Sequence, residues 1–168
     1  MDLAKLETGK LALRYQTFNL HHFGEGCVEA VRRQAAKKQI ELRYVLNDHT
    51  AELTSDFQRL QQIIHHLLTN ALKFTEVGGQ VELEIRCETA VSQVVFVVRD
   101  TGIGIEAADL ERIFEPFVQL DSSLARQHEG TGLGLGLAAK MAHLLDGELT
   151  AASTPSKGST FTLILPWK

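Results

Sequence analysis

The first residues that could do chemistry lie together on one predicted helix. His66, Asn70 and Lys73 are spaced i, i+4 and i+7, so a helix places them on one face, opposite much of its apolar stripe. An amide oxygen such as that of Asn70 can ligate Mg²⁺, which prefers oxygen ligands. Lys73 can reach a phosphate group as a point charge. Taken alone, however, this spacing is more typical of a solvated polar face.

A second group is the stretch DTGIGI at 100–105, which follows an apolar run. A carboxylate at the end of a strand, held in a partly apolar pocket, can accept a hydrogen bond from an exocyclic amine such as N6 of adenine. Gly102 and Gly104 allow the backbone to approach a flat base or a ribose closely. The alternatives are an ordinary capped turn and a dinucleotide-binding fold. The latter needs a third glycine that opens a helix after the first strand, and none follows here.

A third group is the stretch GTGLGLG at 130–136, directly before a helical run. Backbone N–H groups at a helix N-terminus, together with the positive end of the helix dipole, bind phosphate oxygens. No Gly-Lys-Ser/Thr sequence follows, so this is not a Walker loop. A flexible hinge is the competing interpretation, but four glycines in seven residues favour a phosphate site.

Alternating helices and strands must position these three groups. The apolar periodicity predicts helices at 1–10, 18–38, 56–74 and 133–145, and a short helix within 105–114. It predicts strands at 40–46, 81–87, 94–99, 148–153 and 160–165. Residues 118–130 contain few core residues and indicate a long functional loop. Several strands are neighbours in sequence, so we expect a mixed sheet with helices on one face, an α+β two-layer sandwich.

The composition excludes several classes of protein. The chain has 168 residues, of which 44% are hydrophobic and 23% charged, as expected for a soluble domain with a real core. A net charge of -4 argues against a nucleic-acid partner. No apolar run is long enough to cross a membrane, and no signal peptide is visible. Cys27 and Cys87 lie far apart, which predicts reduced thiols in a cytoplasmic protein.

Together, the three groups resemble motifs of the catalytic ATP-binding domain of sensor histidine kinases, within the superfamily of DNA gyrase, Hsp90 and MutL. HHLLTNALKFT resembles the N box, DTGIGI the G1 box, FEPF the F box, GTGLGL the G2 box and KGSTFTLILP the closing strand. FEPF between two glycine boxes favours a histidine kinase over a gyrase-type ATPase. DLAKLETGKLAL resembles the end of a dimerisation helix and its linker. The resemblance thus implies a Bergerat-type fold at 16–168, preceded at 1–15 by a helix whose beginning is missing.

The resemblance implies a role for each site residue. Asn70 would bind Mg²⁺, Lys73 would contact phosphate, and Asp100 would hydrogen-bond the adenine amine. Arg126, in a lid at 118–129, would reach the γ-phosphate, and Thr160 would support the adenine through a water molecule.

Other residues would act through their backbone or by packing. Gly102 and Gly104 would line the base pocket. Gly132 and Gly134 would form the hinge of the lid and offer N–H groups to phosphate. Gly130, Thr131 and Leu133 would also bind the nucleotide. Phe114 and Phe117 would pack under the lid rather than contact nucleotide.

Two positions depart from the family's usual pattern. His66 stands where histidine kinases usually have asparagine, and where the gyrase and Hsp90 branches have a glutamate that acts as general base. A neutral histidine can accept a proton near pH 7, but we favour a tolerated residue of the helix surface. Glu129 replaces a glycine that many members have before the G2 box, and we expect it to stiffen the lid slightly.

A phosphoacceptor histidine is missing from the expected context. In this family the γ-phosphoryl group goes to a histidine followed by an acid on a separate helix hairpin. Among the seven histidines only His128 precedes an acid, and it lies in the predicted lid. We therefore predict that the chain binds ATP and Mg²⁺ without phosphorylating itself.

The resemblance also implies partners. These are the missing dimerisation helices and a response regulator receiver domain, with no nucleic-acid or membrane contact. The isolated chain would be a monomer and the full kinase a homodimer. The alternatives are an ATPase with His66 as base, a non-catalytic nucleotide-sensing module, and a serine kinase of the anti-sigma type.

Overall fold

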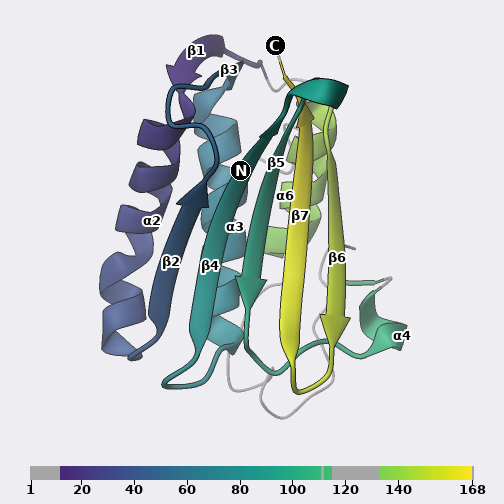
Figure 1. The fold of residues 1–168 in the computed structure, drawn as a ribbon. Coiled ribbons are helices and arrows are strands. Elements are labelled where there is room, and N and C mark those ends of the chain that lie inside the picture. The colour runs from purple at the N-terminus through teal and green to yellow at the C-terminus, as the bar shows by residue number, and fades with distance from the viewer. Residues whose placement is uncertain (1–11, 111, 115–132, 168) are drawn as a thin grey trace.

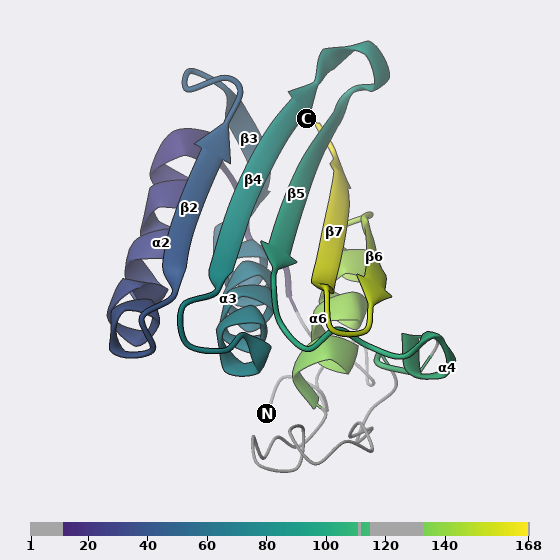
Figure 2. The ribbon, with the colours of Figure 1, turned by 60° about the horizontal axis from the view of Figure 1, so that its bottom comes forward.

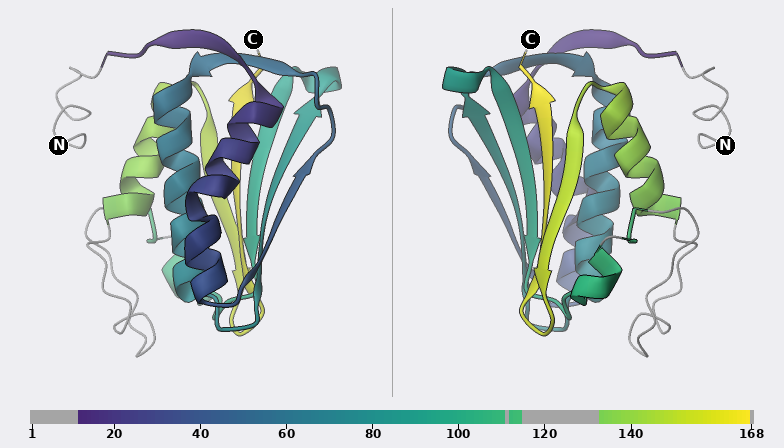
Figure 3. Two further views of the ribbon diagram at one scale, coloured as in Figure 1. Left: turned by 90° about the vertical axis from the view of Figure 1, so that its left-hand side faces the viewer. Right: turned by 90° about the vertical axis from the view of Figure 1, so that its right-hand side faces the viewer.

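Three helices cover one face of a five-stranded sheet in the computed structural model, which describes residues 12–110, 112–114 and 133–167. The edge-on views show these helices, α2, α3 and α6, on the same side of the sheet (Figure 3). The elements in chain order are β1 (Tyr15–Asn19), α2 (Leu20–Lys37), β2 (Glu41–Leu46), β3 (Glu52–Asp56), α3 (Phe57–Phe74), β4 (Gln80–Glu88), η1 (Thr89–Val91), β5 (Gln93–Asp100), α4 (Ala107–Leu110), α6 (Leu133–Leu144), β6 (Glu148–Thr154) and β7 (Gly158–Pro166). The predicted α+β two-layer sandwich is confirmed.

The sheet is mixed, as its connections require. Its strand order is β2-β4-β5-β7-β6 (Figure 1). β2 and β4 are parallel, and the chain crosses between them through β3 and α3, whereas the other neighbours are antiparallel. The strands that are neighbours in sequence form two antiparallel hairpins, β4–β5 and β6–β7.

A second, two-stranded sheet was not predicted from the sequence. β1 and β3 pair antiparallel at one end of the sandwich, with Tyr15 opposite Asp56 (Figure 1). Both strands are short and rich in polar residues, so they lack the apolar alternation that marks a half-buried strand. The predicted start of the first long helix at Phe18 was therefore too early. The helix begins at Leu20, after Asn19, whose side chain accepts a hydrogen bond from the His22 N–H at 2.9 Å.

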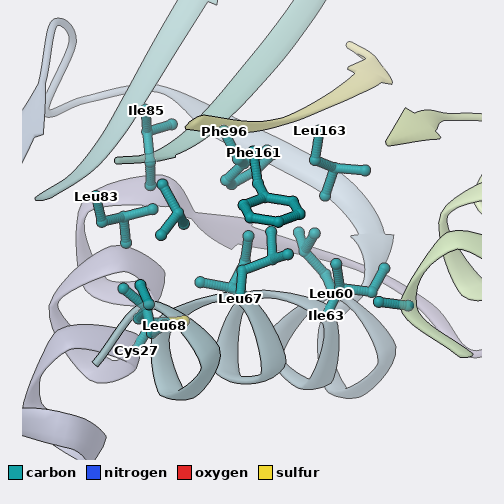
Figure 4. Close-up of a cluster of buried hydrophobic side chains, with 14 of the residues drawn as sticks. Cys27, Leu60, Ile63, Leu67, Leu68, Leu83, Ile85, Phe96, Phe161 and Leu163 are labelled. Atoms are coloured by element: carbon teal, nitrogen blue, oxygen red, sulfur yellow. The ribbon is translucent and has the colours of Figure 1, made fainter. Parts of the chain in front are cut away.

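The core lies between the helices and the inner face of the sheet. Leu60, Ile63 and Leu67 of α3 point toward Phe96 and Phe161 of the sheet (Figure 4). These three residues and Phe96 are fully buried. Because this apolar stripe fixes the rotation of α3 about its axis, the polar residues on the other side of the helix are directed away from the core.

Asp56 links the segment that precedes β1 to the start of α3. One oxygen of its buried carboxylate accepts a hydrogen bond from the Arg59 N–H at 3.1 Å and caps the helix. The other oxygen accepts a hydrogen bond from the Arg14 N–H at 2.8 Å. A single carboxylate thus fixes both the path of the chain toward β1 and the N-terminus of α3.

Replacing Asp56 should therefore lower the free energy of unfolding. We expect Asp56→Ala to lose about 1–3 kcal/mol, because two partly buried N–H groups lose their acceptor. Asp56→Asn, with one amide oxygen, should fall between that variant and the wild type. Urea unfolding measures both, with the exposed Glu29→Ala as a control that should change stability little. Equal unfolding midpoints for Asp56→Ala and the wild type would contradict this role.

Candidate functional site

Three segments that are distant in sequence meet at one end of the sandwich, the lower end in Figure 1. They are the C-terminal end of α3, the segment Asp100–Ile105 after β5, which we call the G1 segment, and the turn between β6 and β7 (Figures 1 and 2). This is the end opposite to the two-stranded sheet of β1 and β3. The polar residues at the end of α3 and the DTGIGI stretch, two of the three groups identified in the sequence, thus lie at the same end of the domain.

The polar face of α3 is partly exposed. His66, Asn70 and Lys73 are each half-buried, as predicted for one face of a helix whose other side is core. No described residue forms a hydrogen bond with the Asn70 side-chain amide. The Lys73 ammonium lies 5.5 Å from the centre of the Phe74 ring, a cation–π contact that directs it toward the helix end.

His66 is neutral near pH 7. Burial lowers the pKa of its imidazole, and the charge of the neighbouring His65 lowers it further. Its ring can therefore accept a proton, although a lowered pKa makes it a weaker base.

The backbone carbonyls at the end of α3 are held by side chains. Lys38, just after α2, donates hydrogen bonds from Nζ to the carbonyl oxygens of Leu72 and Lys73, both at 2.9 Å. The Thr75 hydroxyl donates to the carbonyl oxygen of Ala71 at 2.6 Å. These carbonyl groups lack an N–H donor within the helix itself, so such partners stabilise its last turn.

The G1 segment is joined directly to this helix end. The Ile103 N–H donates to the carbonyl oxygen of Phe74, the last residue of α3, at 3.2 Å. Gly102 is buried, and a Cβ on it would overlap that same carbonyl group. The glycine is thus required for the close approach of the G1 segment to α3. That Gly102 also lines a base pocket stays a prediction.

The β6–β7 turn holds the other side of the G1 segment. The Ile105 N–H donates to the Ser153 hydroxyl at 2.7 Å, and the Ser156 N–H donates to the Ile103 carbonyl oxygen at 2.7 Å. Gly104 has a φ of +72° and packs against the carbonyl of Thr154. Gly104 therefore meets both a backbone and a steric requirement within the chain.

The Asp100 carboxylate is half-buried at the centre of this arrangement. Its Oδ1 accepts hydrogen bonds from the N–H groups of Gly102 at 2.9 Å and Ser159 at 3.3 Å. No described residue donates a hydrogen bond to Oδ2. Burial raises the pKa of Asp100, and the two backbone hydrogen bonds oppose that shift without cancelling it. One oxygen is thus fixed while the other keeps its acceptor capacity for a ligand.

Ser159, rather than the predicted Thr160, shares a sheet face with Asp100. In the β5–β7 register Asp100 is opposite Ser159, and Arg99 is opposite Thr160. Successive side chains of a strand alternate between faces, so Thr160 lies on the side of Arg99. The expected water-mediated role of Thr160 is therefore not supported by its position. Sequence reasoning missed Ser159 and Ser153, whose hydroxyls lie 2.8 Å apart. Ser159 is the serine of the KGST motif, directly before the predicted Thr160, and Ser153 lies opposite it on β6.

Several predicted site residues fall outside the described part of the chain. These are Arg126, Gly130, Thr131 and Gly132, together with Phe117 of the F box. Leu133 and Gly134 form the first turn of α6. Phe114 lies edge-to-face against Phe161, with ring centres 6.4 Å apart, so it packs on the core.

The described residues contain no group of three or more His, Cys, Asp or Glu side chains that could hold a metal ion. Both cysteines are free thiols, and burial raises the pKa of Cys27 to about 12. None of the described helices is long and apolar enough to span a bilayer.

Comparison with known proteins agrees with this fold. The family described as histidine kinase-, DNA gyrase B- and HSP90-like ATPase matches residues 55–168. The circadian input-output histidine kinase CikA of Thermosynechococcus vestitus is 39% identical over 168 residues, which cover 99% of this chain and 23% of CikA. The chain spans about a fifth of the length of the curated relatives it matches.

Solved structures of histidine kinases share the architecture. Full-length ShkA in complex with AMPPNP superimposes with a TM-score of 0.87 at 28% identity, covering 98% of this chain and 33% of ShkA. The catalytic domain of histidine kinase ThkA gives a TM-score of 0.80 at 21% identity, covering 92% of this chain and 99% of that domain.

A mixed sheet under three helices, with an acid and two glycines beside the N-box helix, defines an ATP-binding domain of the gyrase, Hsp90 and histidine kinase type. The chain belongs to the histidine kinase-, DNA gyrase B- and HSP90-like ATPase family. Within that family it is the catalytic ATP-binding domain of a sensor histidine kinase.

The raised pKa of Asp100 predicts how this residue changes stability with pH. A carboxyl whose pKa is raised on folding stabilises the fold below its unfolded pKa, near 3.8, and loses that contribution as pH rises through the folded pKa. In Asp100→Asn the amide oxygen can still accept both backbone N–H groups, so we expect this variant to be at least as stable as the wild type at pH 7.

Urea unfolding between about pH 3.5 and pH 7 tests this expectation. The stability of the wild type relative to Asp100→Asn should fall as the pH rises. Asp48 is a control of opposite sign, because hydrogen bonds from Thr50 lower its pKa, so the wild type should gain on Asp48→Asn over the same range. A wild type that gains on Asp100→Asn with rising pH would contradict the raised pKa.

Proposed function

We propose that this chain binds ATP with Mg²⁺ and donates the γ-phosphoryl group to a histidine of a dimerisation domain outside this chain. The Asp100 carboxylate is the observation that carries the proposal. It is half-buried, one oxygen is held by two backbone N–H groups, and the other takes no hydrogen bond from described residues. An acceptor fixed in this way suits the N6 amine of adenine and rejects the carbonyl of guanine.

Asn70 and Lys73 would serve the phosphate end of the nucleotide. Mg²⁺ keeps several waters and is commonly bound through few protein oxygens together with substrate phosphates. One uncommitted amide oxygen on α3, with no cluster of acids among the described residues, fits that pattern. The bound ion would neutralise charge on the phosphates, while Lys73 would hold a phosphate oxygen as a point charge.

The contribution of the chain to phosphoryl transfer would be positioning and electrostatics. The transition state of this reaction is loose, so few covalent steps fall to the protein. Asp100 would orient the base, Lys73 would stabilise charge on the phosphates, and the N–H groups at the start of α6 would face the phosphate oxygens. AMPPNP, an ATP analogue, is named in the complex of the similar kinase ShkA, which supports ATP as the ligand.

The wider context is also part of the proposal. We place the catalytic domain at 16–168 and assign 1–15 to the end of a dimerisation helix and its linker. The partners would be those dimerisation helices and a response regulator receiver domain, in a cytoplasmic homodimeric kinase. The isolated chain would be a monomer. CikA and other multidomain histidine kinases among the relatives support this arrangement.

Titration calorimetry with ATP, with and without Mg²⁺, tests nucleotide binding. Asp100→Asn should weaken ATP binding by about 1–3 kcal/mol, because the amide places a donor where the adenine amine also donates. Lys73→Met should weaken the binding of ATP and leave that of adenosine little changed. Thr160→Val is the matched control, because the Thr160 side chain lies on the opposite face of the sheet from that of Asp100. This variant should bind ATP as the wild type does.

Each result separates one part of the proposal from the others. Wild-type protein that binds no ATP would overturn the proposed function. Binding that does not distinguish Asp100→Asn from the wild type would leave ATP as a ligand and remove Asp100 as the adenine contact.

An ATP-hydrolysing enzyme is the second candidate, because His66 is a neutral imidazole one turn before Asn70. If His66 were the base that activates water, His66→Asn would slow phosphate release by roughly 10²–10⁴-fold. We expect instead that His66→Asn retains phosphotransfer to a supplied dimerisation hairpin. We also expect no acid-labile phosphohistidine on the chain alone. Phosphate release and phosphohistidine formation from labelled ATP give both answers in one experiment.

A further inference from the structure

Lys38 reaches from the end of one helix to the end of another. It is the residue that follows α2, and its own N–H caps that helix by donating to the Ala35 carbonyl oxygen at 3.2 Å. Its side chain crosses to α3, where Nζ donates to the carbonyl oxygens of Leu72 and Lys73. α2 and α3 run side by side over the sheet (Figure 3). A single side chain therefore ties their two C-terminal ends together.

The surroundings of Lys38 favour a fixed rather than a mobile ammonium group. The side chain is half-buried, and burial lowers the pKa of its amine while the charge of Glu76 opposes that shift. A cation at the C-terminus of α3 also complements the negative end of the helix dipole. The group lines a pocket of about 360 Å³ together with Lys73, Phe74 and Ile103.

We propose that Lys38 is a positioning residue for nucleotide binding, which fixes the last turn of α3 and through it both Lys73 and the G1 segment. The inference rests on the proposed function for its nucleotide readout. Lys38 itself is not placed against the nucleotide. It acts through the backbone of the residues that are.

A short series of hydrogen bonds carries the effect. Lys38 holds the carbonyl of Lys73, the residue expected at the phosphates. The next carbonyl along the helix, that of Phe74, accepts the Ile103 N–H. Ile103 adjoins Gly102, whose N–H donates to the Asp100 carboxylate. Without Lys38, two carbonyl groups lose their hydrogen-bond donor and the last turn of α3 becomes less ordered. Lys73 and Asp100 are then no longer held in a fixed position relative to each other.

The first test needs no nucleotide. Amide exchange of Ile103, followed by NMR in the free protein, should be faster in Lys38→Met than in the wild type. Lys38→Arg should restore the wild-type rate, because a guanidinium can donate to two neighbouring carbonyls. Asn19→Ala removes a helix cap at the opposite end of the molecule and serves as a control that lowers stability to a similar extent. In this control, Ile103 exchange should rise no more than the loss of global stability requires.

The second test is a double-mutant cycle on ATP affinity. Lys38→Met should weaken ATP binding on the order of tenfold in the wild-type background. In the Lys73→Met background the same change should have a smaller effect, because the part that acts through the Lys73 side chain is already gone and only the part through the G1 segment remains. Lys37→Met, an exposed neighbour on the same chain segment, should bind ATP as the wild type does.

The outcomes distinguish this inference from the proposed function. Unchanged Ile103 exchange in Lys38→Met overturns the inference, whatever the ATP affinity. Faster exchange with a full tenfold loss in both Lys73 backgrounds also overturns it, since no part of the loss would then act through Lys73. If no variant or wild type binds ATP, the proposed function fails, and the claim for nucleotide binding falls with it, while the exchange result still decides whether Lys38 holds the helix end.

Discussion

Every backbone carbonyl in the last turn of α3 needs a hydrogen-bond donor from outside the helix. Residues of the candidate site and its surroundings supply these donors. The partners come from three directions. Thr75 supplies one from the residue after the helix, Lys38 supplies two from the end of α2, and Ile103 supplies one from the G1 segment. The helix end is therefore the junction at which an element of the core meets the segment that carries Asp100.

This junction explains residue choices that a nucleotide alone would not require. Gly102 must lack a side chain because the Phe74 carbonyl occupies the space that a Cβ would need. Gly104 has a positive φ and faces the β6–β7 turn for a similar steric reason. Glycines in such motifs are readily attributed to ligand contact, but here intrachain packing is sufficient to require them. Backbone contact with a ligand is compatible with that requirement, because a glycine without a side chain allows close approach from either the chain or a ligand.

The elements that bury apolar residues at regular spacing were predicted from the sequence. The strands that lack such a pattern were missed. The stripe of α3 and the β4–β5 hairpin follow from spacing alone, because the core side of each must be apolar. β1 and β3 are polar strands at the edge of the domain, held by each other and by Asp56, so no local pattern reveals them. Among site residues, Asp100 stood out as an acid ending an apolar run. Ser159 and Thr160 are adjacent hydroxyl residues, and only the strand register shows which one faces Asp100.

Asp100 is desolvated and has no cationic partner among the described residues, which costs free energy of folding when its carboxylate is charged. Most acids of the open sheet face are paired, as Glu82 and Glu84 are with Arg99 at 2.9 Å, whereas Asp100 is half-buried with only backbone N–H groups on one oxygen. A charge desolvated in this way destabilises the ligand-free domain near neutral pH. A ligand that donates to the second oxygen recovers part of that energy, and a ligand that presents an acceptor there adds repulsion. The selectivity proposed for Asp100 and the instability that its burial causes would thus have the same physical origin, so a substitution that removes one would also remove the other.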